Sequence, residues 1–397
     1  MSDQNPIFIP GPTNTPDRLR RAMQVQNLDH RSRAFAETFM PVLQDLKPVF
    51  GTVDATTLIY PSTGTGGWEV AIANTVSPGD RVLAARYGLF SDRWIDTCKR
   101  FGLHVDVIDC VWGDGVPIAE IEAALTRDKA HEIKAVLVTH NETATGVRAD
   151  VAGVRAAMDA ASHPAMLYVD AVSSLASMDF RMDEWGIDVA VAGSQKGFML
   201  NAGMAVLAVS PKALEAHRSA TLPRAFNDFT DMITANQSGG YPYTPPLQLI
   251  FGLRASLDML AEEGLEAVYA RHFKMAEGVR RAITALGLNL VANASHLYSD
   301  TVSSIYVPEG FDGNRLVTHA SEVYGMSFGV GLGKLNGKTF RIGHLGSLTV
   351  PMMLSGLAII EMALVDMGVG LQLGTGVAAA QDYYRSNQAG ATKYLAA

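Results

Sequence analysis

The residue best suited to covalent chemistry is Lys196, in the run VAVAGSQKG at residues 189–197. An apolar strand is predicted to end there in a short polar turn that carries a single lysine. Burial of an ammonium group is costly, and desolvation or a nearby cation lowers the pKa of the amine. A neutral amine can add to a carbonyl group and form an imine. By itself, the turn also fits a lysine that extends past a strand end into solvent.

A second segment, MLYVDAVSS at residues 166–174, predicts another apolar strand that ends in Asp170. Open α/β sheets bind ligands at the carboxyl ends of their strands, which is where this carboxylate would lie. A carboxylate beside a pyridinium nitrogen keeps that nitrogen protonated, so that the cofactor ring can accept electrons. Without the other segments, Asp170 could equally well cap the turn that follows it.

A third segment, LIYPSTGTGGWE at residues 58–69, predicts a strand, a glycine-rich turn and the start of a helix. The free N–H groups and positive dipole end of such a helix attract an anion, and glycine lets a phosphate approach the backbone. We expect Thr65, Gly66 and Gly67 to form the phosphate cradle. The spacings of the Walker and dinucleotide motifs are absent, and a plain strand–helix turn is the simpler alternative for this segment alone.

The elements that would position these residues form an alternating pattern. Short apolar runs occur at residues 56–60, 81–85, 104–108, 135–139, 165–170, 188–192 and 205–209. Segments with helical periodicity lie between most of them, which favours an α/β domain with a mostly parallel seven-stranded sheet. The last run follows its predecessor without a long helix, so we expect it to be the antiparallel member.

The chain divides into three predicted parts: an irregular arm at residues 1–20, a large domain at 21–264 and a smaller α+β domain at 265–397. In the large domain, helical patterning covers residues 15–50 and 245–264. In the small domain we expect helices near 265–286 and 349–368, strands near 301–307 and 339–343, and a helical tail after residue 376.

Taken together, these segments resemble the class V aminotransferases of the fold-type I superfamily that depends on pyridoxal 5'-phosphate (PLP). The similarity covers essentially the whole chain and is greatest to the bacterial aspartate–glyoxylate and serine–glyoxylate group. The motifs that carry it are PGPTN (10–14), DHRS (29–32), TGTGGWE (63–69), THNETATG (139–146), VDAVSS (169–174), GSQKG (193–197), YPYTPP (241–246) and FRIGHLG (340–346).

The resemblance implies roles for individual residues. Lys196 would form the imine with PLP and move the proton at Cα, and Asp170 would pair with the pyridine nitrogen. Arg341 would bind the substrate α-carboxylate through its planar fork. The remaining cofactor contacts implied are Thr65, Gly66 and Gly67 with Gln195 at the phosphate, Phe90 and Val172 on the two ring faces, and either Thr143 or Thr145 near the ring hydroxyl.

Two further residues, Tyr241 and Thr244, would reach the phosphate in the neighbouring subunit, so the resemblance implies a homodimer. It does not fix whether dimers pair into tetramers. For His30, His140 and His344, packing is the preferred interpretation, because the lysine already supplies a base.

The implied reaction transfers an amino group from a small L-amino acid to glyoxylate through pyridoxamine phosphate, in a ping-pong cycle that yields glycine and a keto acid. Similarity of residues 5–14, 177–185 and 195–200 favours aspartate as donor, giving oxaloacetate; serine and alanine are the alternatives. Arg33 and Arg224 could bind a second carboxylate, although solvated surface charges are the preferred interpretation. A PLP lyase and a non-catalytic PLP-fold protein are the competing classes.

Composition narrows the remaining choices. The 397 residues include 48% hydrophobic and 18% charged residues, with a net charge of -8 and no cluster of five basic residues. We therefore expect neither nucleic-acid nor membrane binding. Cys98 and Cys110 have no spacing typical of a metal site or a disulfide framework, and a desulfurase would need a cysteine in a late loop. Together with the absence of an apolar leader, this favours a cytoplasmic protein without a metal.

Overall fold

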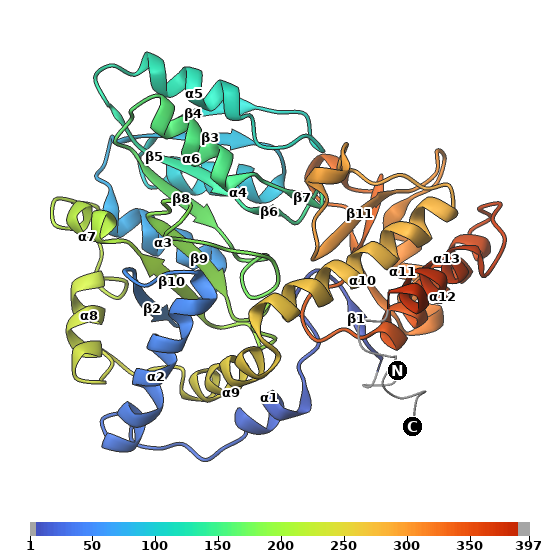
Figure 1. Ribbon diagram of the computed structural model, residues 1–397, viewed down its shortest axis with the longest axis horizontal. Helices are drawn as coiled ribbons and strands as arrows, with labels where there is room; N and C mark the ends of the chain where they lie inside the picture. Colours follow the sequence, from blue (N-terminus) through green and yellow to red (C-terminus); the bar gives the residue numbers. More distant parts are fainter. Residues whose placement is uncertain (1–4, 388–397) are drawn as a thin grey trace.

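The computed structural model describes residues 5–387, and in it the chain forms two lobes, each built around its own sheet. Figure 1 shows the larger lobe in blue to yellow and the smaller lobe in orange to red, with α10 (Leu265–Ala285) extending between them. The smaller lobe is built mainly from C-terminal elements, but the N-terminal strand β1 (Ile7–Phe8), drawn in blue, also lies within it.

The larger lobe contains a seven-stranded sheet in the order β2-β10-β9-β8-β5-β3-β4. Its strands are β2 (Thr56–Tyr60), β3 (Arg81–Arg86), β4 (His104–Asp109), β5 (Ile133–Thr139), β8 (Met166–Asp170), β9 (Val189–Gly193) and β10 (Ala205–Val209). All seven apolar runs are therefore strands. The β10 strand pairs antiparallel with both β2 and β9, as predicted, whereas β9, β8, β5, β3 and β4 are mutually parallel.

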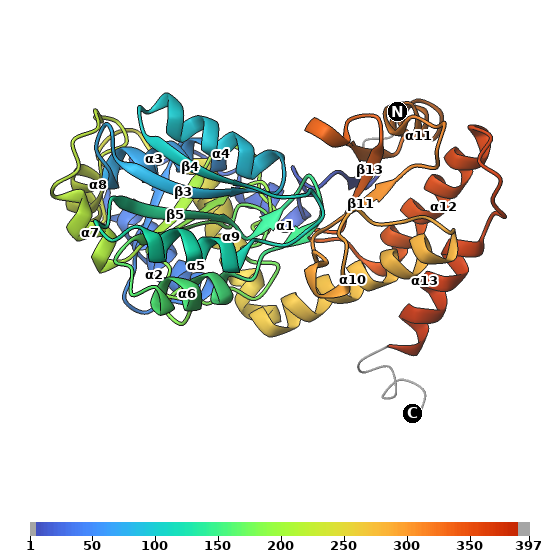
Figure 2. The same cartoon turned by 90° about the horizontal axis from the view of Figure 1, so that it is seen from above.

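Helices cover both faces of this sheet, which explains why β8, β9 and β10 are buried along their whole length. Figure 2 shows α4 on one side and α5 with α6 on the other. The helices of the lobe are α2 (Arg33–Phe50), α3 (Gly64–Thr75), α4 (Leu89–Arg100), α5 (Ile118–Arg127), α6 (Val151–Ala160), α7 (Pro211–His217), α8 (Phe229–Gln237) and α9 (Leu247–Glu263). A short hairpin of β6 (Asn141–Glu142) and β7 (Val147–Arg148) follows β5.

The helical pattern expected over residues 15–50 is interrupted. Helix α1 (Asp17–Ala22) ends early, residues 23–32 are not helical, and α2 begins at Arg33. Ser32 causes the restart, since its side chain accepts a hydrogen bond from the N–H of Phe35 and thereby caps α2. Asn27, Asp29 and Ser32 in the intervening segment are residue types that favour turns and caps, a signal that the apolar pattern alone does not register.

The smaller lobe has a four-stranded sheet in the order β1-β12-β13-β11. Its elements are β11 (Val302–Tyr306), α11 (Gly313–Tyr324), β12 (Ser327–Val330), β13 (Thr339–Gly343), α12 (Val350–Asp366) and α13 (Thr375–Ser386). The arm was expected to be irregular, but β1 pairs parallel with β12, a strand that was not predicted. Phe8 stacks on Phe328 at 5.4 Å between ring centroids, so burial of one aromatic ring fixes the arm.

Each lobe has a separate apolar core, one around the large sheet and one between α10, α12 and the small sheet. We retain as a proposal the division of the chain at residue 264, where Gly264 joins α9 to α10. Between residues 5 and 387, no helix is long and apolar enough to cross a membrane.

Candidate active site

A cavity of about 110 Å³ lies at the carboxyl ends of β8 and β9, between the glycine-rich turn and the β6–β7 hairpin. It brings together most of the residues that the sequence singled out. The residues that line it are Thr63, Gly64, Thr65, Trp68, Phe90, Thr143, Asp170, Val172, Ser173, Gln195 and Lys196. Segments more than a hundred positions apart therefore meet at one edge of the sheet.

Lys196 is buried at this edge, with 9% of its surface exposed, and its Nζ donates a hydrogen bond to the carbonyl of Pro10. Burial, together with the positive charge of Arg341, lowers the pKa of the Lys196 amine to about 8, although the charge of Asp170 opposes this shift. The lysine is thus far closer to its neutral, nucleophilic form at physiological pH than a solvated lysine is.

The N-terminal arm packs directly over this lysine, a contact that the sequence did not predict. A Cβ at Gly11 would lie 2.4 Å from Cδ of Lys196, and Gly11 has a φ of +93°, which disfavours any side chain. Thr13 accompanies it: its hydroxyl donates to the carbonyl of Lys196 at 3.2 Å. The PGPTN motif therefore holds the lysine turn in place.

Asp170 lies across the cavity and is likewise buried. Burial raises the pKa of its carboxyl group to about 7, and the charge of Glu142 acts in the same direction. The N–H of Val172 donates to Asp170 Oδ1 at 2.9 Å, which opposes this rise. A cationic ring nitrogen beside Asp170 would supply the countercharge that this buried carboxylate lacks.

The glycine-rich turn begins α3, and Thr63 at its N-cap makes no side-chain hydrogen bond to the first turn. That leaves the start of the helix available for an anion. Gly64 and Gly66 are tightly packed, since a Cβ would lie 2.3 Å from Val172 at the first position and 1.9 Å from the hydroxyl of Ser62 at the second. The N–H of Gly67 donates to the carbonyl of Thr63, and a Cβ at Gly67 would lie 2.5 Å from Val191 on β9.

The other wall residues suit a planar, phosphorylated ring. Gln195 has a buried Oε1 without a hydrogen-bond partner within the described residues, and so an unmet polar group faces the cavity region. Phe90 and Val172 both contribute apolar surface. An anion seat, an apolar slot, a buried carboxylate and a buried lysine are together the groups that PLP requires.

The two threonines of the hairpin loop border different cavities. Thr143 lines the cavity, and its hydroxyl is 2.9 Å from the hydroxyl of Ser173. Thr145 instead borders a separate small cavity together with Arg280. Thr143 is therefore the residue able to reach a bound ring, and Ser173 is a neighbour that the sequence analysis did not single out.

Arg341 projects from β13 toward the same loop and is 7% exposed. Its Nε donates to the carbonyl of Val330 at 2.8 Å, and its Nη1 donates to the carbonyl of Thr143 at 3.1 Å. Both partners are neutral carbonyls rather than a carboxylate. Burial lowers the pKa of the guanidinium to about 10, which still leaves it charged at neutral pH. It is therefore oriented and available to an anionic ligand.

Tyr241 and Thr244 do not line the cavity of their own chain. The hydroxyl of Tyr241 donates to the carbonyl of Ile59 at 2.6 Å, and Thr244 is exposed. Arg33 and Arg224 are also remote from the cavity lining: the first pairs with Glu37, and the second pairs with Asp228.

Two of the histidines are tied into the structure. His140 is 2.9 Å from the hydroxyl of Ser174, and His344 is 2.9 Å from the carbonyl of Asp300. Burial lowers the pKa of both imidazoles to about 3, so neither would carry a proton near neutral pH. Burial also raises the thiol pKa of Cys98 to about 12 and of Cys110 to about 11, which opposes a nucleophilic role.

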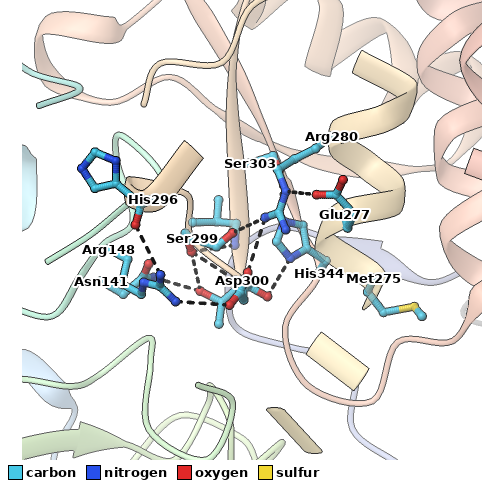
Figure 3. Close-up of polar contacts among 12 residues, drawn as sticks. Asn141, Arg148, Met275, Glu277, Arg280, His296, Ser299, Asp300, Ser303 and His344 are labelled. Carbon is cyan, nitrogen blue, oxygen red and sulfur yellow. Dashed lines mark hydrogen bonds and ion pairs between the residues drawn. The ribbon is translucent and has the colours of Figure 1, made fainter. Parts of the chain in front are cut away.

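A polar network attaches the small lobe to the hairpin (Figure 3). Asp300 lies between Arg280, at 3.4 Å, and Arg148 of the hairpin, at 3.7 Å. Beside it, Asn141 donates to the hydroxyl of Thr301 at 2.9 Å and to that of Ser173 at 2.8 Å. The lobe that carries Arg341 is thus fastened to the loop that borders the cavity.

Known proteins are similar to this chain in sequence and fold. Residues 12–322 match the family model for aminotransferase class V. The chain is 58% identical to L-aspartate–glyoxylate aminotransferase of Paracoccus denitrificans, over 100% of both chains. It is 54% identical to serine–glyoxylate aminotransferase of Hyphomicrobium methylovorum, over 96% of this chain and 95% of that one. The solved structure of ureidoglycine–glyoxylate aminotransferase from Bacillus subtilis is 25% identical with a TM-score of 0.90, covering 97% of this chain and 99% of that chain.

Proposed function

This chain belongs to the class V aminotransferases, and we propose that it transfers the amino group of L-aspartate to glyoxylate, forming glycine and oxaloacetate. It is a PLP-dependent enzyme of fold type I that acts on amino acids and 2-oxo acids. The observation that carries the proposal is the convergence of Lys196, Asp170 and the glycine-rich start of α3 on one cavity, with Arg341 hydrogen-bonded to its wall.

When bound, PLP supplies an electron sink for the electrons released at the amino-acid Cα. Lys196 would hold the cofactor at rest and, once freed, remove the Cα proton, a task that its lowered pKa favours. Asp170 would keep the ring nitrogen protonated. Thr65 and Gly66 at the start of α3, with Gln195, would bind the phosphate, whereas Gly67 would contribute through helix packing.

The ring would be held between Phe90 and Val172, with Thr143 at its hydroxyl. Arg341 would bind the carboxylate that donor and acceptor share. Glyoxylate has no side chain, so its orientation would depend almost wholly on this one fork. The second half-reaction would run the chemistry of the first in reverse on glyoxylate, and both would use one carboxylate site, which accounts for a ping-pong cycle without a second binding site.

Aspartate is the first choice of donor because the relative that is 58% identical over the full length carries that name. Serine is the second candidate, supported by the relative at 54% identity.

We propose a homodimer in which Tyr241 and Thr244 complete the phosphate site of the partner subunit. Both lie outside the cavity of their own chain, and Thr244 is exposed and free to cross an interface.

The test is a spectral titration of the purified holoenzyme with aspartate, serine and alanine added separately, each followed by glyoxylate. We expect aspartate to bleach the absorption band of lysine-bound PLP and glyoxylate to restore it, with oxaloacetate and glycine as products. The variant Lys196→Ala is the control and should show no such band. If serine or alanine bleached the band far better than aspartate, the donor would be wrong; a wild-type protein that binds no PLP would overturn the proposal altogether.

A further inference from the structure

Glu142 is a fully buried carboxylate beside the cavity to which the proposed reaction assigns no task. It lies in β6, at the start of the hairpin that carries Thr143. Its hydrogen-bond donors are three backbone N–H groups, from Phe90 at 3.2 Å, Ser91 at 2.9 Å and Ala144 at 3.1 Å. A carboxylate that is buried at such cost needs several good donors to remain in place.

Two of these donors belong to the first turn of α4, whose Phe90 lines the cavity. The positive dipole end of α4 also favours a negative charge at this position. Gly88 leaves the necessary space: a Cβ there would lie 2.1 Å from Cγ of Glu142, although the extended backbone of Gly88 would permit a side chain. The glycine at position 88 is therefore required by the glutamate rather than by the conformation of the turn.

The third donor, Ala144, follows Thr143, whose carbonyl accepts the hydrogen bond of Arg341. Glu142 is also the nearby charge that raises the pKa of Arg341 against the effect of burial. One carboxylate thus connects the aromatic wall of the cavity, the loop at the cavity edge and the guanidinium.

We propose that Glu142 is a positioning residue. It fixes Phe90 against the cofactor ring and thereby strengthens PLP binding. It also holds the Thr143 carbonyl that accepts a hydrogen bond from Arg341, and so affects the affinity for the substrate carboxylate. This inference rests on the roles proposed above for Phe90 and Arg341. Glu142 touches neither ligand in this account; it acts through the backbone that it anchors.

The chain offers a matched control in Glu361, another buried glutamate. Glu361 accepts backbone hydrogen bonds from Gly374 and, at 2.7 Å, from Val377 at the start of α13. It performs the same kind of helix anchoring in the small lobe without contact with the cavity lining. Both Glu142→Gln and Glu361→Gln replace a carboxylate with an amide that presents an N–H₂ group to N–H donors.

The experiment measures PLP dissociation constants and steady-state kinetics at saturating PLP for the wild type and both variants. We expect Glu142→Gln to weaken PLP binding about 10- to 100-fold and to raise KM for both substrates more than it lowers kcat, as loss of a charge-assisted contact implies. We expect Glu361→Gln to lower thermal stability and leave PLP affinity and KM unchanged.

The inference is wrong if Glu142→Gln changes PLP affinity and KM by less than about twofold. If that variant does not fold, Gly88→Ala decides, because it displaces the glutamate from the opposite side and should weaken PLP binding in the same way. A wild-type enzyme that binds PLP but does not use glyoxylate would refute the proposed function. The PLP dissociation constants of the wild type and Glu142→Gln would still test the role of Glu142.

Discussion

Replacement of Arg341 by lysine tests how the enzyme binds both of its substrates. The guanidinium donates from Nε to the carbonyl of Val330 and from Nη1 to the carbonyl of Thr143, and these two bonds fix its orientation. Lysine keeps the charge, but its single ammonium cannot satisfy both carbonyls and also grip a carboxylate in two places. The variant should therefore lose at least one charge-assisted hydrogen bond to the substrate.

Such a bond contributes about 1.5–3 kcal/mol. Since about 1.4 kcal/mol corresponds to a factor of ten, kcat/KM should fall roughly 10- to 150-fold. The loss should be similar for aspartate, serine and glyoxylate, because the group that they share is the carboxylate next to the reacting carbon. PLP binding should change little, since Arg341 is not among the residues that line the cofactor cavity.

The assay is steady-state kinetics with each donor and with glyoxylate varied in turn, accompanied by a PLP titration and a thermal melt. Arg315→Lys provides the control, since Arg315 is exposed on α11 of the same lobe. A loss confined to aspartate would refute the reasoning, because it would mean that Arg341 recognises the second carboxylate of that donor. A loss confined to PLP affinity would instead place the arginine at the cofactor.

Three other predictions concern the lysine, the arm and the lobe junction. The rate at which apoenzyme takes up PLP should rise with pH to a plateau with a midpoint near 8, because only the neutral amine of Lys196 reacts. Stopped-flow absorbance from pH 6 to 10 measures this rate, and a midpoint near the pKa of free lysine would contradict the prediction. Gly11→Ala should slow this uptake by at least about tenfold, because its Cβ would lie 2.4 Å from Lys196 Cδ. Unchanged uptake would show that the arm moves to accommodate the methyl group. Asp300→Asn should lower the free energy of unfolding by about 1–3 kcal/mol, since Arg280 and Arg148 would lose the carboxylate that they share. Urea denaturation measures this change, and equal midpoints for the variant and the wild type would show that the ion pairs do not stabilise the fold.

The large sheet could be predicted from the sequence because each strand contains a short apolar run and helical segments lie between most of these runs. Even the antiparallel β10 was foreseen, since the chain after β9 is too short to hold a crossover helix. The small sheet was harder. Its strand β12 has only four residues, and β1 has two, so neither shows a period, and their pairing depends on burial of Phe8 against Phe328.

The same contrast applies to the site. Lys196 and Asp170 stand at the ends of strongly apolar strands, so the strand pattern alone places them at one edge of the sheet. Glycines in a turn look alike in sequence, and only the structure shows that Gly67 also packs against Val191 on β9. Glu142 was missed because its partners are backbone N–H groups, which leave no trace in residue types. The nearest signal was the glycine at position 88, whose purpose is visible only beside the glutamate.

The buried charges of the site explain why one short cavity can serve two reactants. Lys196 and Arg341 are cations whose hydrogen bonds go to neutral carbonyls, and Asp170 accepts from a neutral N–H. Each charge is therefore held in place but only partly compensated, and the pKa values shift toward the neutral forms. A phosphorylated cation ring and then a carboxylate would supply the missing countercharges in turn. Binding at such a site gains electrostatic free energy because the protein has already met the cost of desolvating its own groups. The two lobes and the N-terminal arm together bury these charged groups, because Arg341 comes from the small lobe and the arm packs over Lys196.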